Sequence, residues 1–261
     1  MVRNDLVMEI PWDVEATLLS RPNRFLGIVE LDPSTFSSDD PNFNSSSSSS
    51  SGVIQEKVHI HDPGRLEDLL FPGNRLLLRK ATNPKRKTGW DVIAAKADDG
   101  WILINSAFHR KIAEWAIANK VCSCFENVLE VIPEQKFGDS RLDFLLKKSD
   151  TELWVEVKGC TLIDGSTATF PDAPTTRGKR HVGELKKALE SGSEALIMFI
   201  VLRKNASCFK ANASIDPDFA ETFKDAVNAG VQVCPLVFSY EGRELFYMGK
   251  VPLCTDEYNS I

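Results

Sequence analysis

Long apolar runs are absent from this 261-residue sequence. The longest one, residues 195–202, is far shorter than the roughly 20 residues that a membrane-spanning helix needs. The segment before residue 16 carries several acidic side chains, which are atypical of secretory and mitochondrial leaders. We therefore expect a chain without a membrane segment or a leader peptide.

An excess of positive charge is also missing. The 31 Lys and Arg residues are outnumbered by 37 Asp and Glu residues, which gives a formal net charge of -6. This balance excludes a wholly basic nucleic-acid binder. Local basic patches can still attract phosphate groups, because physiological salt screens charges only beyond about 8 Å. The hydrophobic content of 43% is enough for conventional buried cores.

Cysteines are few and irregularly spaced. The sequence holds 6 of them, which is too few for a disulfide-stapled scaffold in a chain of this length. Cys122 and Cys124 are one residue apart, which is the spacing neither of a redox CxxC motif nor of a paired zinc knuckle. We expect ordinary thiols in a reducing, intracellular setting.

A polar tract interrupts the first part of the chain. Residues 45–51 are all serine, and proline and aspartate precede them. Such a tract cannot bury enough apolar surface to offset its ordering entropy, so we expect residues 33–52 to be disordered. The flanking residues 25–29 and 53–60 have the pattern of β-strands, which makes the tract an insertion within one domain.

The pattern of elements changes near residue 105. Short strands are predicted before it, at residues 25–29, 53–60, 74–80, 90–96 and 101–105. Beyond it, helical and strand patterns alternate, with helices near residues 177–191 and 216–229 and apolar strands at 194–202 and 231–239. These patterns predict a small β-barrel domain in residues 1–104 and an α/β domain in residues 105–261.

One predicted hairpin carries most of the chemistry. If Ser149 and Asp150 form a two-residue turn, the register of the strands on either side is fixed. The pairs on one side are then wholly apolar. The pairs on the other side are Lys147 with Glu152, Leu145 with Trp154, Asp143 with Glu156, and Arg141 with Lys158.

This register places two carboxylates directly opposite one another. Asp143 and Glu156 would have Cβ atoms about 4.5–5.5 Å apart, which is destabilising unless positive charge lies between them. A divalent cation such as Mg2+ or Mn2+ that keeps waters and accepts a phosphate oxygen would meet this need. Lys158, two residues beyond Glu156, could then orient an attacking water or stabilise negative charge.

A purely structural explanation is also available. In the same register, Arg141 is diagonal to Glu156, and Asp143 is diagonal to Lys158, so the four charges could form an exposed salt-bridge quartet. Glu134, in the preceding strand region, is a further candidate metal ligand. Both explanations remain open from these residues alone.

Longer motifs resemble the sugar fermentation stimulation protein A (SfsA) family. In the second half, these motifs are residues 140–144 (SRLDF), 155–162 (VEVKGCTL) and 170–185 (FPDAPTTRGKRHVGEL). In the first half, they are residues 21–26 (RPNRFL), 61–66 (HDPGRL) and 71–73 (FPG). The resemblance covers nearly the whole chain outside the serine tract.

The resemblance implies an OB-like β-barrel followed by a PD-(D/E)xK nuclease-like α/β domain, in proteins regarded as DNA-binding. Asp143, Glu156 and Lys158 match the catalytic signature of that nuclease superfamily, and Glu134 matches a carboxylate ahead of it. The chain departs from the family at residues 107–110, where the family has an asparagine-containing start to a helix.

A first basic cluster lies in the predicted barrel. Its candidate DNA-binding residues are Arg79, Lys80, Lys85, Arg86 and Lys87, with Trp90 as an aromatic partner for bases. A solvated hairpin tip would have the same composition.

A second basic cluster opens the helix predicted near residues 177–191. Its candidates for phosphate binding are Arg177, Lys179 and Arg180, and Gly178 would allow the backbone to approach a ligand closely. His181 could contact phosphate, but a lone histidine on a helix is more often a packing residue.

Together these features predict a DNA-binding protein with limited sequence preference and a nuclease-like metal site. In the enzymatic hypothesis, Asp143, Glu156 and Glu134 bind Mg2+ or Mn2+, and Lys158 positions water for phosphodiester hydrolysis. The alternative is a non-catalytic, regulatory DNA-binding protein that retains the nuclease fold.

Overall fold

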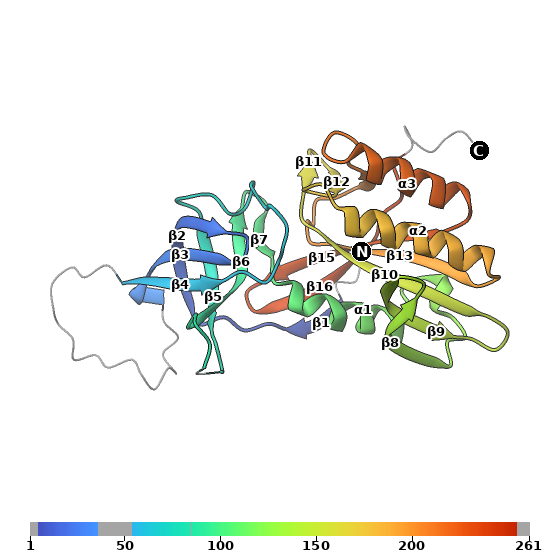
Figure 1. Cartoon of the computed structure of the whole chain (residues 1–261). Helices are drawn as coiled ribbons and strands as arrows, with labels where there is room; N and C mark the ends of the chain where they lie inside the picture. The colour runs from blue at the N-terminus through green and yellow to red at the C-terminus, as the bar shows by residue number, and fades with distance from the viewer. Residues whose placement is uncertain (1–4, 36–53, 84, 255–261) are drawn as a thin grey trace. The chain divides into compact units, whose positions relative to one another are not determined.

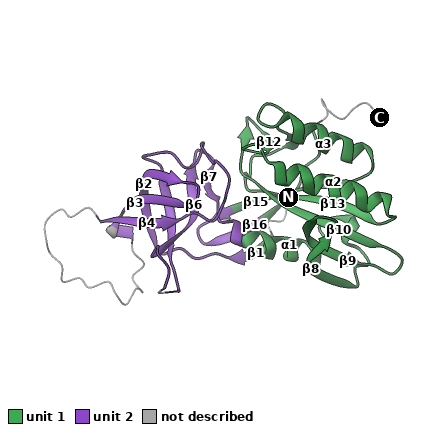
Figure 2. Cartoon of the chain, viewed as in Figure 1, with its two compact units in different colours: residues 1–7, 108–239, 247–261 green, residues 8–107, 240–246 purple. Residues whose placement is uncertain are grey.

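The computed structural model describes residues 5–35, 54–83 and 85–254. The chain forms two compact units (Figure 2). The barrel unit comprises residues 8–107 and 240–246, and the α/β unit comprises residues 1–7, 108–239 and 247–261. Most of the predicted disordered insertion, residues 33–52, lies outside the described residues; only a short 3₁₀ turn, η1 (Pro33–Thr35), is described at its start.

The barrel unit is a closed barrel of five strands (Figure 1). Its strands are β2 (Val14–Asn23), β3 (Leu26–Leu31), β4 (Gln55–His59), β5 (Arg75–Lys80) and β6 (Trp90–Ala97). They are hydrogen-bonded in the order β4-β3-β2-β5-β6, and a parallel pairing of β4 with β6 closes the ring. The predicted OB-like fold is therefore confirmed.

The five strands of the ring differ from the five predicted ones at one place. The strand predicted at residues 101–105 is present but is not a strand of the ring, and the sequence pattern of β2 was not recognised. In the structure, β7 (Gly100–Leu103) pairs with β6 outside the closed ring, and β2 completes it. The signal for β2 is present in the sequence, because Val14, Ala16 and Leu18 alternate and are all buried in the barrel.

The α/β unit is built around a mixed sheet in the order β15-β13-β10-β9-β8. These strands are β8 (Glu130–Phe137), β9 (Ser140–Lys147), β10 (Glu152–Cys160), β13 (Glu194–Val201) and β15 (Gln232–Glu241). The strands β10, β13 and β15 run parallel, whereas β8, β9 and β10 are joined antiparallel.

The remaining elements complete the chain. They are β1 (Asp5–Glu9), η2 (Ser106–Phe108), α1 (His109–Ala118), η3 (Ser123–Phe125), β11 (Ile163–Asp164), β12 (Thr167–Phe170), α2 (Thr176–Glu190), β14 (Cys208–Ala211), α3 (Pro217–Asn228) and β16 (Glu244–Lys250). A small second sheet contains β11, β12 and β14. None of the helices in the described part of the chain has the length and apolar character of a membrane span.

Two helices cover one face of the α/β sheet (Figure 1). Val182 and Leu185 of α2 and Phe223 of α3 pack in one core with Ile197 and Phe199 of β13. Helix α1 packs against the opposite face of β10. Successive strand residues point to opposite faces, and α1 contacts Gly159 whereas α2 contacts Glu156.

Side-chain caps fix the starts of both covering helices. The Asp216 carboxylate accepts a hydrogen bond from the Phe219 N–H at 2.9 Å, and Pro217 occupies the first turn of α3. The Thr175 hydroxyl accepts from the Gly178 N–H at 3.0 Å. A Cβ at Gly178 would lie 2.8 Å from the Thr175 methyl group, so the cap itself requires a glycine at this position.

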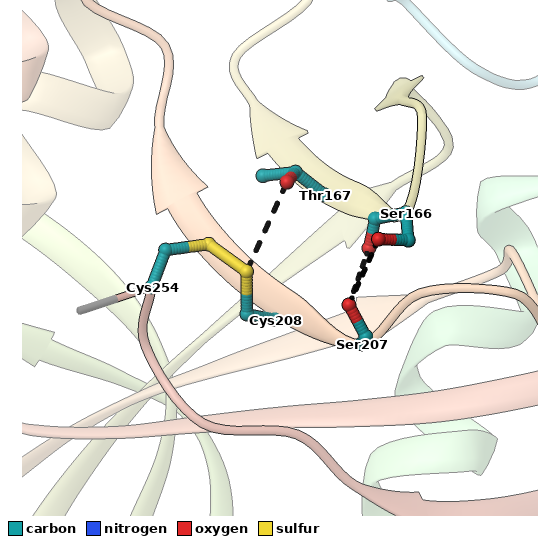
Figure 3. Close-up of a disulfide and its surroundings, with 5 residues drawn as sticks. All are labelled: Ser166, Thr167, Ser207, Cys208 and Cys254. Atoms are coloured by element: carbon teal, nitrogen blue, oxygen red, sulfur yellow. Dashed lines mark hydrogen bonds between the residues drawn. A yellow bond between two sulfur atoms is a disulfide. The ribbon is translucent and has the colours of Figure 1, made fainter. Parts of the chain in front are cut away.

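The expectation of free thiols is wrong for four of the cysteines. Cys208 on β14 is disulfide-bonded to Cys254, with Cα atoms 5.1 Å apart (Figure 3). Cys122 is bonded to Cys234, which lies on β15. Both disulfides join residues that are far apart in the sequence, so the spacing of neighbouring cysteines does not predict them. Cys124 and Cys160 are free and buried.

Candidate metal centre

The hairpin between β9 and β10 has the predicted register in the half that lies next to its turn. Its pairs run from Lys147 with Glu152 to Phe144 with Val155. The predicted pairs beyond this point, Asp143 with Glu156 and Arg141 with Lys158, are absent from the ladder between these described strands. The side chain of Asp143 takes the place of a ladder bond, because its Oδ2 accepts a hydrogen bond from the Val157 N–H at 2.7 Å.

Helix α2 covers the side of the hairpin that carries the charges. Leu145 and Trp154, which pair across the strands on that side, are buried beneath α2. Glu156 follows Trp154 on the same face, and only 2% of its surface is exposed. No ion pair among the described residues joins Arg141 to Glu156, so the exposed salt-bridge quartet is not formed.

Two donors hold one oxygen of the Glu156 carboxylate. Lys158 Nζ and His181 Nδ1 both contact Oε1. The other oxygen, Oε2, is buried and has no hydrogen-bond partner among the described residues. Burial alone would raise the pKa of Glu156, but Lys158 and His181 outweigh it and the pKa is lowered. The carboxylate is therefore ionised, and one of its oxygens has no hydrogen-bond partner among the described residues.

Asp143 is close enough to Glu156 for the two charges to interact. Burial and then the Glu156 charge raise the pKa of Asp143 to about 6, against the lowering effects of the Val157 N–H and Lys158. Glu134 raises it further. The structure thus brings together Asp143, Glu156 and Lys158, the predicted catalytic residues.

These carboxylates fit a divalent cation that takes few protein ligands. Within residues 5–35, 54–83 and 85–254, no three His, Cys, Asp or Glu side chains are grouped as a metal site. Asp143 and Glu156 form a two-carboxylate set, which is the habit of Mg2+ when waters and phosphate complete its shell. Glu134 is exposed on β8 and affects the pKa of Asp143 through its charge. It does not join Asp143 and Glu156 in a group of three metal-ligating side chains.

His109 also lies in this region, although no sequence motif pointed to it. It begins α1, and a Cβ on Gly159 would lie 2.2 Å from its Cε1. Its Nε2 is buried without a partner among the described residues. Burial, followed by the charge of Lys158, lowers the pKa of His109 to about 4, so the ring is neutral at physiological pH. In the sequence, His109 is marked only by its place in residues 107–110, where the chain departs from the pattern of the family that it resembles.

The second basic cluster divides between the two sides of α2. Arg177 Nε donates to His181 Nε2 at 3.4 Å, and Arg180 Nε donates to the Ser140 hydroxyl at 3.2 Å. Lys179 instead pairs with Asp218 of α3 at 2.9 Å, and this hydrogen bond raises its pKa. All three cations are exposed, but only Arg177 and Arg180 have contacts on the side of Glu156 and β9.

The first basic cluster is smaller than predicted. Both Arg86 amino groups bind the Asp91 carboxylate, at 2.9 and 2.7 Å, and His61 binds it at 3.0 Å. Trp90 is 7% exposed and belongs to the barrel core, so its predicted role as a stacking surface is wrong. Arg79 is half-buried. Lys80, Lys85 and Lys87 are exposed as predicted.

An OB barrel followed by an α/β unit with this acidic site defines the class of protein: an OB domain joined to a nuclease-like domain. Residues 19–104 match the family described as "SfsA N-terminal OB domain". Residues 107–244 match "Sugar fermentation stimulation protein RE domain". The chain belongs to the sugar fermentation stimulation protein (SfsA) family.

Curated relatives and a solved structure agree with this assignment. The sugar fermentation stimulation protein homolog of Methanococcoides burtonii is 87% identical over 261 residues, which covers all of both chains. That of Methanothermobacter thermautotrophicus is 38% identical over 92% of this chain and 90% of its own. The structure of Pyrococcus furiosus SfsA in complex with Ca2+ has a TM-score of 0.81 and 28% identity, and covers 95% of this chain and 99% of its own.

Proposed function

We propose that this protein binds DNA and hydrolyses its phosphodiester bonds with a divalent cation, Mg2+ or Mn2+, bound by Asp143 and Glu156. The observation that carries the proposal is the buried, ionised Glu156 carboxylate, whose Oε2 has no partner among the described residues. An ionised buried oxygen without a donor is costly unless a ligand satisfies it. The neighbouring carboxyl of Asp143 makes a cation the matching ligand.

Each residue of the site has a separate task in this proposal. Bound between the carboxylates, the cation would polarise a phosphate oxygen and lower the pKa of a bound water. Lys158 Nζ would orient the attacking water and stabilise the negative charge that develops on the phosphate. Arg177 and Arg180, exposed at the start of α2, would hold the phosphate groups that flank the scissile bond.

The relative solved with Ca2+ supports a cation with oxygen ligands in this family. Ca2+ and Mg2+ are both hard cations that prefer carboxylates, and they differ mainly in the number and rigidity of their ligands. A set of two protein carboxylates favours Mg2+, which usually keeps several of its waters. Glu134 could add a water-mediated contact, which is the role its exposed position on β8 suits best.

The barrel unit would supply additional contacts to the DNA backbone. Lys80, Lys85 and Lys87 are exposed near one another in the sequence, and OB domains commonly bind nucleic acids. Lysine contacts to phosphate position a nucleic acid but do not read its sequence, so we infer limited sequence preference. Action inside the cell is part of this proposal.

The test is cleavage of labelled single- and double-stranded DNA with Mg2+ or Mn2+ by the wild type and by Asp143→Asn. We expect metal-dependent cleavage that the substitution abolishes. The matched control is Asp150→Asn, which removes an exposed carboxylate from the turn of the same hairpin and should cleave normally. Cleavage that survives in Asp143→Asn would contradict the assignment of the site.

A second candidate function is DNA binding without cleavage. It is favoured by the contact between Lys158 and Glu156, because a satisfied ion pair can also be a purely structural element. In that case the protein would bind DNA in a salt-sensitive manner, and no product would appear with either cation.

A further inference from the structure

Helix α2 carries a histidine whose two ring nitrogens are both hydrogen-bonded. His181 is buried, with 2% of its surface exposed. Its Nδ1 contacts Oε1 of Glu156, and its Nε2 lies 3.4 Å from Nε of Arg177. The ring therefore connects an exposed arginine to the buried carboxylate of the proposed metal site.

The partners of the ring determine where its proton lies. A guanidinium has only N–H donors, so Nε2 of His181 must accept the hydrogen bond from Arg177 with its lone pair. A neutral imidazole carries its single N–H on the other nitrogen, which places the proton on Nδ1. His181 consequently donates to Oε1 of Glu156. This tautomer is assigned from the hydrogen-bond partners.

His181 is also the donor to Glu156 that can persist throughout a reaction. The other donor, Lys158, has a flexible side chain. In the proposed function, its ammonium group must contact the attacking water and the phosphate. The imidazole is held by its own burial and by the rigid helix α2. With Oε1 bound to His181, Oε2 is the carboxylate oxygen that has no hydrogen-bond partner among the described residues.

We propose that His181 is a positioning residue, which holds the Glu156 carboxylate by an Nδ1–H donor so that Oε2 can face a divalent cation. Arg177 keeps the ring in the tautomer that can donate. This inference rests on the proposed function, because it assumes that Glu156 binds the cation. Partners of this kind, behind a ligating carboxylate, typically change metal affinity about 10–100-fold when they are removed.

Two substitutions of His181 separate positioning from packing. The amide nitrogen of asparagine is the same number of bonds from Cβ as Nδ1, whereas that of glutamine matches Nε2. Glutamine is closer to histidine in volume. If the ring merely fills space, His181→Gln should be the milder change; if Nδ1–H is needed, His181→Asn should be milder.

The measurement is Mn2+ and Ca2+ affinity by calorimetry on the full chain. We expect His181→Asn to bind within roughly threefold of the wild type and His181→Gln to bind about 10–100-fold more weakly. Glu190→Gln, an exposed change at the far end of the same helix, should bind like the wild type. Equal affinities of the two His181 variants, or stronger binding by His181→Gln, would overturn the inference.

The wild-type protein offers a second readout if either variant fails to fold. Ring nitrogen chemical shifts of His181 report its tautomer directly. We expect protonated Nδ1 and unprotonated Nε2, both without metal and with saturating Ca2+. A proton on Nε2 would overturn the inference even though metal still binds, whereas a wild type that binds neither cation would overturn the proposed function itself.

Discussion

Ionisation of Asp143 makes the folded protein less stable. The difference in the free energy of unfolding between Asp143→Asn and the wild type should measure this effect. Burial and the Glu156 charge raise the pKa of this carboxyl from 3.8 to about 6. Because one pKa unit corresponds to about 1.4 kcal/mol, ionisation at neutral pH costs the folded state up to roughly 3 kcal/mol. Asparagine does not ionise, and its side-chain oxygen can still accept the Val157 N–H.

The effect depends on pH in a defined direction. The folded state holds the Asp143 proton more tightly than the unfolded chain does between pH 3.8 and about 6. The free energy of unfolding of the wild type therefore falls as the pH rises through this window, and the loss is complete above it. Asp143→Asn should be more stable than the wild type at pH 7, and this advantage should vanish near pH 4.

Urea and thermal unfolding of both proteins in EDTA measure this difference. For a unit of this size, a gain of about 3 kcal/mol raises the melting temperature by roughly 6–12 °C. Asp150→Asn, at the exposed turn, should change the stability by less than about 0.5 kcal/mol. Adding Mg2+ or Ca2+ should stabilise the wild type and not Asp143→Asn. A variant less stable than the wild type at pH 7 would refute the reasoning.

Three further predictions follow from single features of the fold. Gly159→Ala places a Cβ 2.2 Å from the His109 ring and should cost about 1–3 kcal/mol in urea unfolding, a loss that shrinks in the His109→Ala background. Cys208→Ser opens a disulfide that joins residues 46 positions apart, which should lower the free energy of unfolding by about 4 kcal/mol in oxidising buffer and not with reductant. Trp90→Phe should leave DNA affinity unchanged in a fluorescence-anisotropy titration because the ring is buried, whereas Lys87→Met should weaken it and lower the salt slope by about 1.

The hairpin of the candidate site was predictable because its determinants are local. A two-residue turn fixes the register of the strands that it joins, and the pairs from Lys147 with Glu152 to Phe144 with Val155 are confirmed. The end of the ladder was not predictable. It depends on the Asp143 side chain competing with the backbone for the Val157 N–H, and the strand pattern contains no sign of this competition.

The residues around the carboxylates come from distant parts of the chain. His181 contacts Glu156 across 25 positions of sequence, and His109 reaches Gly159 from the helix on the other face of the sheet. Neither contact has a spacing or a period that a sequence pattern could reveal. A histidine on a helix looks the same whether it packs, faces solvent or holds a carboxylate.

Charge counts in the barrel unit were misleading for a related reason. A run of basic residues shows where cations are, but it does not show which are neutralised. Arg86 binds Asp91, only five positions away, together with His61 from elsewhere in the barrel. Trp90 is an aromatic residue near lysines in the sequence, but it starts a strand whose first six residues are buried.

The pairing of β3 with β4 has a practical consequence for labelling this protein. The two strands are hydrogen-bonded neighbours, with Glu30 opposite Gln55. The connection between them begins and ends at the same point of the barrel. Loop-closure entropy grows only logarithmically, by about 0.6 kcal/mol for each doubling of length. A fluorescent tag or an affinity peptide should therefore be accepted between these strands without loss of folding.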